Sequence, residues 1–390
     1  MTPQHVTLVI EGGYPWYFGG VSEWTCQYLK HFDSTRFSIV QIATKPWRNA
    51  PLDEAIYQLG DNIEHFFQIA PPDLSNAFRE VKCWANGQVD QLPSYAVSDM
   101  VHITNTGLAG ILGIQMGKRF DSQTILTEHA IYWKEIERGA RALECGFKVD
   151  KYGNQKQVQQ TFKKLAQYTY QHTEQIFSVS KSNQPYQKEL GADAVTYIPN
   201  GVERSELTTR KINAPGKELT AGWIGRCADI KNPLRFMDVA DALQKRYRHS
   251  VKFTMLLSET EERDLKRRVM KRAEDIPSLT LHWNKRAYRF IDAMDMLLLT
   301  SRSESQPLVL LEALAHKVLP FGWEIGDARS ELGIFVEQGV PLQTLINKID
   351  TLWNDPVQWE SEVERRFEYV SRYHTWDRIF DEYRKHYSNL

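Results

Sequence analysis

Two glutamates eight positions apart are placed to act on a ligand. Glu304 follows the almost wholly apolar run Met296–Thr300, and such a run is typical of a strand buried on both faces. Glu312 is the only charged residue in the apolar stretch Leu308–Ala315, which Pro307 precedes. Proline suits the first position of a helix. The spacing therefore predicts a strand, a loop that carries Glu304, and a buried helix that carries Glu312.

This arrangement predicts an anion site. In open α/β sheets, ligands bind beyond the carboxyl ends of the strands, where Glu304 is expected. The start of the next helix has unpaired N–H groups and a positive dipole end, which suit a phosphate. Glu312 needs a hydrogen-bonding partner, because burial of a lone carboxylate is costly. The residues alone leave a second interpretation open, in which Glu312 pairs with a buried arginine and Glu304 is a solvated loop charge.

Two cations form a second candidate group. Arg226 and Lys231 follow the predicted strand Leu219–Gly225 and precede a helix that Pro233 opens. Cations at the carboxyl end of a strand can hold a diphosphate and stabilise the negative charge that develops as a glycosyl bond breaks. The alternative is a pair of surface cations without a ligand.

Two further candidates lie near the N-terminus. Gly19 and Gly20 precede a helix for which Ser22 is a plausible N-cap, and glycines there either let the backbone approach a phosphate or permit a tight turn. His129 follows the short strand Thr124–Leu126, so its imidazole is expected at a ligand-facing edge. A lone histidine in such a place is also compatible with a purely structural role.

Strands alternate with helices along both halves of the chain. Two doubly wound parallel α/β domains that face each other over a cleft are therefore expected. The predicted organisation is a first domain over 1–201, a linker over 202–217, a second domain over 218–371, and a C-terminal helix over 372–390 that returns to the first domain.

Composition narrows the function classes. The 390 residues exceed what one core usually supports. A net charge of −1 provides no overall field for nucleic acid, so no nucleic-acid partner is expected. The four cysteines form no C-x-x-C pair, which fits free thiols in a cytoplasmic protein and suggests no metal site. No signal peptide or apolar run of membrane-spanning length is evident. The basic segment 259–274 is a solvated helix face or a patch for anionic lipid at the inner face of a membrane.

Five segments, in order, resemble the retaining glycosyltransferases of family 4, which have the GT-B fold. The segment Glu304 to Glu312 resembles the two-glutamate signature of that family, and the N-terminal segment is similar to its Pel exopolysaccharide branch. Ala130 replaces a glycine that is usual after the histidine. The matching segments are Glu11–Trp24, Thr127–Tyr132, Ile198–Gly201, Gly225–Lys231 and Ser303–Glu312.

The resemblance implies a nucleotide-sugar donor, with UDP as the expected nucleotide, and a glycan or glycolipid acceptor, as in polysaccharide biosynthesis. It implies that Glu304 and His129 face the donor sugar, that Arg226 and Lys231 hold the diphosphate, and that Glu312 holds the ribose. No cofactor or metal is implied, because the donor is a co-substrate. The remaining residues expected to bind substrate are Gly19, Gly20, Asn200, Gln306, Pro307 and Leu308.

Two alternatives stay open. The segment 317–326 departs from the family pattern, which motivates a catalytically silent subunit that binds a sugar or a partner protein. A sugar-nucleotide epimerase or a glycoside phosphorylase would use the same architecture.

Overall fold

The computed structural model describes residues 3–43, 50–72, 78–93, 98–140, 143, 149, 154–209, 212, 218–248, 250–260 and 262–387. The chain divides into two compact units. The first comprises Met1–Pro199 and Ile379–Leu390, and the second comprises Asn200–Arg378. The sequence predicts boundaries at 201 and 371, and the predicted linker 202–217 lies partly outside the described residues.

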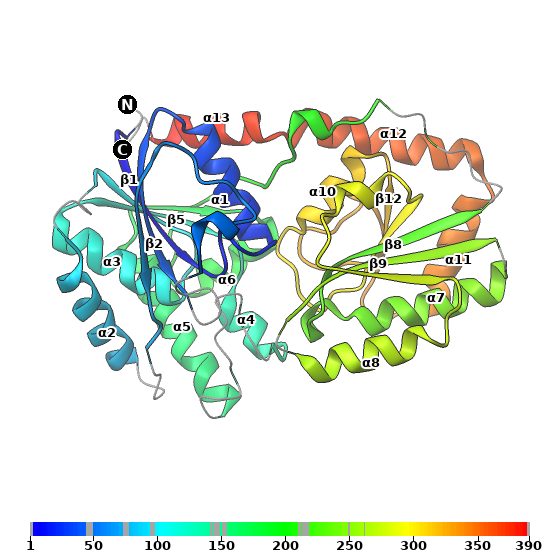
Figure 1. The fold of residues 1–390 in the computed structure, drawn as a ribbon, viewed down its shortest axis with the longest axis horizontal. Helices are drawn as coiled ribbons and strands as arrows, with labels where there is room; N and C mark the ends of the chain where they lie inside the picture. Colours follow the sequence, from blue (N-terminus) through cyan, green and yellow to red (C-terminus); the bar gives the residue numbers. More distant parts are fainter. Residues whose placement is uncertain are drawn as a thin grey trace. The chain divides into compact units, whose positions relative to one another are not determined.

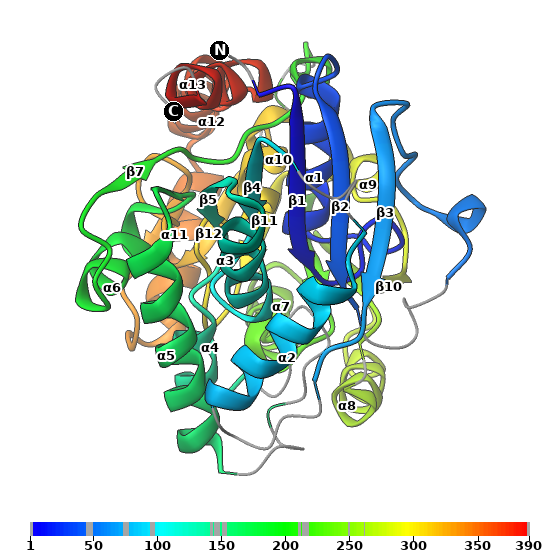
Figure 2. The same ribbon diagram turned by 90° about the vertical axis from the view of Figure 1, so that its left-hand side faces the viewer.

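The first unit is built on a seven-stranded parallel sheet in the order β3-β2-β1-β4-β5-β6-β7 (Figures 1 and 2). The strand order reverses between β1 and β4. The strands are β1 (His5–Glu11), β2 (Arg36–Ile42), β3 (Ile63–Ile69), β4 (Met100–Ile103), β5 (Gln123–Glu128), β6 (Gln175–Ser178) and β7 (Val195–Tyr197). The helices are α1 (Gly20–His31), α2 (Phe78–Gln91), α3 (Leu108–Phe120), α4 (Tyr132–Glu137), α5 (Gln155–His172), α6 (Gln184–Glu189) and most of α13 (Trp376–Tyr387).

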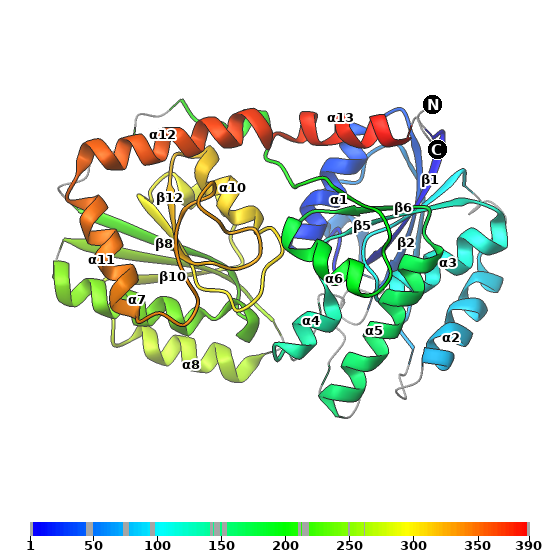
Figure 3. The ribbon, with the colours of Figure 1, turned by 180° about the vertical axis from the view of Figure 1, so that it is seen from behind.

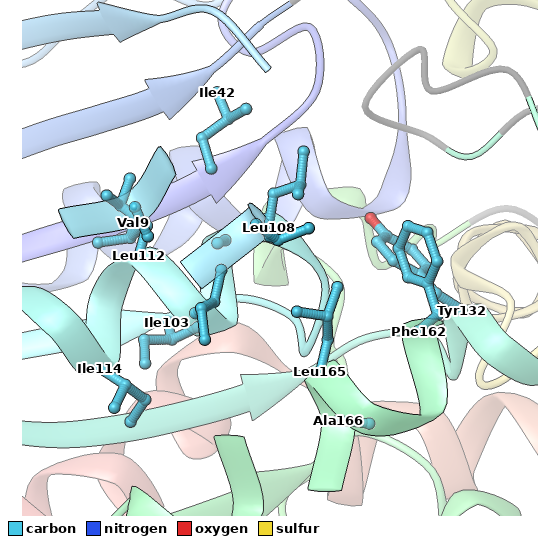
Figure 4. Close-up of a cluster of buried hydrophobic side chains, with 14 of the residues drawn as sticks. Val9, Ile42, Ile103, Leu108, Leu112, Ile114, Tyr132, Phe162, Leu165 and Ala166 are labelled. Carbon is cyan, nitrogen blue, oxygen red and sulfur yellow. The ribbon is translucent and has the colours of Figure 1, made fainter. Parts of the chain in front are cut away.

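One face of this sheet is covered by aliphatic packing. Val9 of β1 and Ile103 of β4 contact the buried side of α3, and Leu165 of α5 continues the same cluster (Figure 4). Helix α3 is buried along almost its whole length, since nine of its thirteen residues are buried. Helices α2, α3 and α5 therefore form one layer over the sheet.

The opposite face is covered by aromatic packing. Trp24 and Tyr28 of α1 stack with ring centroids 4.8 Å apart, and Tyr383 of α13 packs against Phe177 of β6. His102 of β4 lies among these rings. Since α13 belongs largely to the first unit, the C-terminal helix supplies part of that unit's core.

The second unit has a six-stranded parallel sheet in the order β10-β9-β8-β11-β12-β13, and its strand order reverses between β8 and β11 (Figure 3). The strands are β8 (Leu219–Arg226), β9 (Val251–Ser258), β10 (Leu279–Trp283), β11 (Met296–Leu299), β12 (Leu319–Trp323) and β13 (Ile334–Val336). The helices are α7 (Pro233–Tyr247), α8 (Arg263–Ala273), α9 (Tyr288–Ile291), α10 (Leu308–Ala315), α11 (Leu342–Trp353) and α12 (Pro356–Tyr373).

The central strand β11 is buried on both faces, as its apolar run predicts. Met296 and Leu298 join the cluster that contains residues of α7, α8 and α11, whereas Leu297 and Leu299 join the cluster around α10. Two doubly wound parallel α/β units are thus confirmed, each with helices on both faces of its sheet (Figures 1 and 3).

Several local predictions are wrong. Ser22 is not the N-cap of α1, because the cap is Gly19 and Ser22 is the third residue of the helix. Pro307 caps α10 in an extended conformation rather than beginning the helix. Helix α4 and strand β12 are absent from the sequence prediction.

No helix among the described residues is long and apolar enough to cross a membrane. Cys26, Cys83 and Cys227 form no disulfide, and Cys145 lies outside the described residues.

Candidate functional site

The loops after β8 and β11 meet at the point where the strand order of the second unit reverses. Neighbouring parallel strands whose connections leave in opposite directions open a crevice at their carboxyl ends, and ligands of α/β proteins bind in that crevice. Three of the predicted catalytic residues, Arg226, Lys231 and Glu304, lie on these two loops or at the end of β8.

Lys231 and Glu304 form an ion pair at the centre of this site. The Lys231 Nζ atom donates to both carboxylate oxygens of Glu304, at 2.6 and 2.8 Å. The Glu304 side chain is only 8% exposed and that of Lys231 is 23% exposed. A carboxylate with so little access to water requires a partner, and the lysine supplies one. The interpretation of Glu304 as a solvated loop charge is therefore wrong.

The two loops are also joined beside this pair. Arg302 donates its backbone N–H to the carbonyl of Ile230 at 2.8 Å, and its guanidinium donates to Asp229 at 2.9 Å. Because Asp229 and Ile230 form the short 3-10 turn that ends at Lys231, these contacts limit how far that turn can move from the Glu304 loop.

Gly326 packs closely against the backbone of the Glu304 loop. Its φ of +56° is in the left-handed region, and a Cβ atom there would lie 2.2 Å from the Glu304 carbonyl oxygen. Asp327 donates its N–H to the carbonyl of Ser305 at 2.8 Å. Only glycine fits this position, so the segment that departs from the family pattern still carries a residue needed to shape the site.

The start of α10 lies next to Glu304. Gln306 accepts a hydrogen bond from the backbone N–H of Asn200, and both residues are buried. Pro307 is buried and Leu308 is half-buried. The structure therefore brings four predicted substrate-binding residues together around one helix start, the kind of position that suits an anion.

Glu312 lies one turn further along α10. It shares a half-buried face with Leu308, whereas Leu310, Leu311 and the three residues from Ala313 to Ala315 are buried. The prediction of a buried helix holds for most of α10, but its Glu312 face is only partly covered. Arg226 is the last residue of β8 and is also half-buried.

His129 lies in the first unit, directly after β5. Its ring meets that of Trp24 edge to face, with the centroids 4.9 Å apart. Burial lowers the pKa of His129 to about 3, so the imidazole is neutral at neutral pH. Within the described part of the chain its Nε2 atom has no hydrogen-bond partner. This nitrogen is buried, so the structure shows a polar atom without a hydrogen-bond partner at this position and not an exposed ligand contact. A neutral imidazole nitrogen can donate or accept, depending on the tautomer.

Glu128, next to His129, is a polar residue to which the sequence prediction gave no role. Its side chain is fully buried and accepts hydrogen bonds from Thr106 and Tyr170 at 2.6 Å and from Gln187 at 2.7 Å. Burial raises the pKa of Glu128 to about 7, although the three donors act in the opposite direction. The only signal in the sequence is an acidic residue at the end of an apolar strand.

Gly19 and Gly20 occupy the start of α1 in the first unit. Gly19 is the N-cap in an extended conformation and Gly20 is the exposed first residue of the helix. Neither residue has a positive φ. Their backbone therefore does not require glycine, and their place at a helix start remains the reason to consider them for ligand binding.

Among the residues that the structure describes, no group of three or more His, Cys, Asp or Glu side chains is arranged to hold a metal ion.

Sequence families match both units. Residues 4–86 and 88–195 match the family described as Domain of unknown function (DUF3492), and residues 218–355 match Glycosyl transferases group 1. No curated protein matches the chain.

Solved structures share the whole fold at low sequence identity. Sucrose-phosphate synthase from Thermosynechococcus elongatus has a TM-score of 0.77 and 15% identity, over 99% of this chain and 100% of that one. HepE from Anabaena, in complex with UDP-glucose, has a TM-score of 0.71 and 14% identity, over 99% of this chain and 100% of that one. A glycosyltransferase from Rickettsia africae has a TM-score of 0.66 and 16% identity, over 99% of this chain and 98% of that one.

These likenesses extend over both units, and the family match coincides with the unit that carries Lys231, Glu304 and Glu312. The protein thus has the GT-B fold that these glycosyltransferase structures share, and its residues 218–355 match Glycosyl transferases group 1.

Proposed function

We propose that the protein is a retaining glycosyltransferase that transfers a sugar from a UDP-sugar to a hydroxyl of a glycan or glycolipid. The observation that carries this proposal is the Lys231–Glu304 pair beside the start of α10. A cation, a carboxylate and a helix N-terminus thus lie together where the strand order reverses. These groups can bind the diphosphate and the sugar of a nucleotide-sugar donor.

The donor is assigned by the chemistry of each group. Arg226, Lys231 and the start of α10 would bind the diphosphate, and Glu312 would accept hydrogen bonds from the ribose hydroxyls. Glu304 and His129 would contact the sugar. HepE in complex with UDP-glucose has the same fold, which supports UDP as the nucleotide.

The proposed reaction breaks the bond between the anomeric carbon and the donor phosphate oxygen. Negative charge then develops on the diphosphate, and Arg226 and Lys231 stabilise it in place of a metal ion or any other cofactor. The acceptor hydroxyl attacks from the side that the diphosphate leaves, so the anomeric configuration is retained. A donor phosphate oxygen takes the acceptor's proton, and Glu304 stabilises and positions the sugar rather than attacking it.

We also place the protein in glycosyltransferase family 4, near the Pel branch, with a role in polysaccharide biosynthesis in the cytoplasm. The five ordered sequence segments support this assignment. A peripheral contact with the inner face of a membrane would use the basic helix α8, in which Arg263, Arg268 and Lys271 face away from the buried residues Leu265 and Val269.

The catalytically silent alternative was motivated by the divergent segment 317–326. That segment forms the buried strand β12, and Gly326 packs against the Glu304 loop. It therefore provides no support for a loss of catalysis.

The test is a thermal-shift panel of UDP, GDP and ADP sugars, followed by an assay of nucleotide release with candidate acceptors. A ligand at about 100 times its Kd stabilises a protein by about 2.7 kcal/mol. Stabilisation by UDP-sugars and release of free UDP without phosphate dependence are expected. A response to GDP alone overturns the UDP assignment. An altered UDP-sugar indicates an epimerase, and dependence on phosphate indicates a phosphorylase.

A further inference from the structure

We propose that Thr300, oriented by Trp223, is a positioning residue that holds Lys231 against Glu304 for the transfer reaction. This inference rests on the proposed function and adds two residues to it. Thr300 lies just after β11 and Trp223 lies within β8, so the two strands on either side of the reversal each contribute one residue.

A chain of hydrogen bonds joins the two strands. The Trp223 Nε1–H donates to Thr300 Oγ1 at 2.9 Å. The Thr300 hydroxyl in turn lies 3.0 Å from the carbonyl oxygen of Asn232 and 3.3 Å from that of Lys231. Trp223 is 2% exposed and Thr300 is 4% exposed, so water does not replace these contacts.

The direction of this chain is fixed by chemistry. An indole N–H can only donate, so the Thr300 oxygen accepts its proton. The single hydroxyl proton of Thr300 is then directed to the carbonyls at 231 and 232. The two carbonyls can only accept, so Thr300 donates to them, and the Trp223 N–H occupies the acceptor side of the hydroxyl and holds it in that orientation. Thr300 thereby attaches the β11 loop to the residue that carries the catalytic cation.

Gly225 gives this arrangement room. A Cβ atom at Gly225 would lie 3.0 Å from the Cη2 atom of the Trp223 ring. The indole therefore extends along β8 over Gly225, toward the end of the strand where Arg226 stands. Gly225, which precedes Arg226, thus leaves room for the indole.

The other contacts between the loops act on other atoms, and one of them is the pairing of the Lys231 ammonium group with Glu304. Arg302 contacts Asp229 and Ile230, and its guanidinium is largely exposed. Asn232, which follows Lys231, has a left-handed φ of +52°. Backbone hydrogen bonds hold this residue within its own turn, and the Asn232 carbonyl also accepts the N–H of Arg235. The Thr300 hydroxyl adds a buried contact from the β11 loop to the carbonyls at 231 and 232, so its loss should loosen the turn and misplace the ammonium group.

Misplacement of a catalytic group should lower turnover more than it weakens binding. Displacement by about 1 Å can reduce a rate by about 100-fold. We therefore expect Thr300→Val, which keeps the shape and removes the hydroxyl, to lower kcat at least about tenfold while KM for the donor changes less than about threefold. Thr300→Ser restores the hydroxyl and should recover most of the turnover.

The matched control is Thr254→Val in β9 of the same sheet, where Thr254 lies beside Gly222 in register. It should leave kcat unchanged. Trp223→Phe removes the indole donor together with part of the buried ring, and it should lower kcat by a smaller factor than Thr300→Val. In the double variant the two losses should not add, since both changes break one chain of hydrogen bonds.

Hydrogen exchange of the full protein gives a readout that does not depend on activity. Amides of the peptide 227–232 should exchange at least about tenfold faster in Thr300→Val than in wild type, and at the wild-type rate in Thr254→Val. Unchanged exchange in Thr300→Val overturns the inference, as does wild-type turnover. A wild-type protein that is inactive with every UDP-sugar refutes the proposed function instead, and the exchange result still decides the role of Thr300. If Thr300→Val does not fold, Trp223→Phe replaces it as the variant that breaks the chain of hydrogen bonds: its 227–232 amides should exchange faster than those of wild type and of Thr300→Ser, and unchanged exchange overturns the inference.

Discussion

The two α/β units hold their carboxylates in different ways. In the first unit, Glu128 is fully buried and is surrounded by three neutral donors. In the second, Glu304 is paired with the cation of Lys231 and keeps some exposure. Glu128 is desolvated without a compensating charge, which raises its pKa, whereas Glu304 has a cation as its direct partner. The first unit thus satisfies its buried glutamate with hydrogen bonds alone, and the second pairs its glutamate with a cation.

The largest expected effect comes from removal of the cation. We expect Lys231→Ala to lower turnover about 100-fold or more, because loss of one group that stabilises developing charge costs about 3 kcal/mol. Lys231→Met keeps the length of the side chain and should be equally poor, whereas Lys231→Arg should keep a little activity. Steady-state release of UDP measures this.

Lys245→Ala is the matched control for Lys231. Lys245 is an exposed lysine of α7 whose side chain is 79% accessible. Its loss should leave turnover unchanged. Wild-type turnover in Lys231→Ala would mean that the ion pair of the second unit has no more part in catalysis than the neutral cluster around Glu128.

The two glutamates of the second unit should differ next. Glu304→Gln keeps a hydrogen-bonding group but loses its charge, so turnover should fall at least about 100-fold while UDP affinity stays within about threefold. Glu312→Gln should mainly weaken binding, of UDP as well as of UDP-sugar. Calorimetry with UDP alone separates the two roles, because UDP lacks the sugar. The opposite pattern would mean that the roles are reversed or the site is misplaced.

Much of the fold, and the places of the candidate residues in the second unit, could be predicted from the sequence, because each rested on a local pattern. The run Met296–Thr300 is apolar on both faces, and Pro233 marks the start of α7. The strand–loop–helix order around Glu304 fixed the edge of the sheet to which it belongs. The sequence pattern does not show that Lys231 pairs with Glu304, because the two residues are 73 positions apart. The order of the strands in the sheet brings them together.

The interactions that the sequence prediction did not provide are long-range or depend on backbone conformation. Glu128 accepts hydrogen bonds from three separate segments of the chain, and no spacing pattern in the sequence predicts these contacts. Gly326 is required because of the carbonyls that it approaches. Strand β12 contains Pro320 and Gly322, which weaken a strand pattern, and it forms because its residues are buried beside β11.

A smaller effect is expected at Glu128, and it depends on pH. The pKa of Glu128 is raised in the folded protein to about 7, so its contribution to stability is full below the unfolded pKa of 4.5 and is lost as the pH rises to 7. Glu128→Gln cannot ionise. Its free energy of unfolding, relative to wild type, should therefore rise between pH 5 and 7, by at most about 1.4 kcal/mol per pH unit.

Urea unfolding followed by circular dichroism at several pH values tests this, with Glu189→Gln as the control. Glu189 is an exposed residue of α6 whose side chain is 56% accessible. A difference between Glu128→Gln and wild type that does not change with pH would contradict the account of a neutral polar cluster.

The last prediction concerns His102, which should act in the opposite direction to Glu128 within the same unit. His102 is fully buried, and its ring nitrogens lie 2.8 Å from Thr127 Oγ1 and 3.3 Å from Tyr387 Oη. Burial, together with the charge that His129 would carry, lowers the pKa of His102 to about 3. The stability that it contributes is thus present above the unfolded pKa of 6.5 and is lost as the pH falls toward 3. His102→Gln removes this titration and keeps a polar group, so its stability should depend less on pH than that of wild type between pH 4.5 and 6.5. The expected change in slope is at most about 1.4 kcal/mol per pH unit, and it is smaller wherever protonation of His129 replaces that of His102. Urea unfolding across this range measures it, and an unchanged slope would mean that His102 is not held neutral by burial.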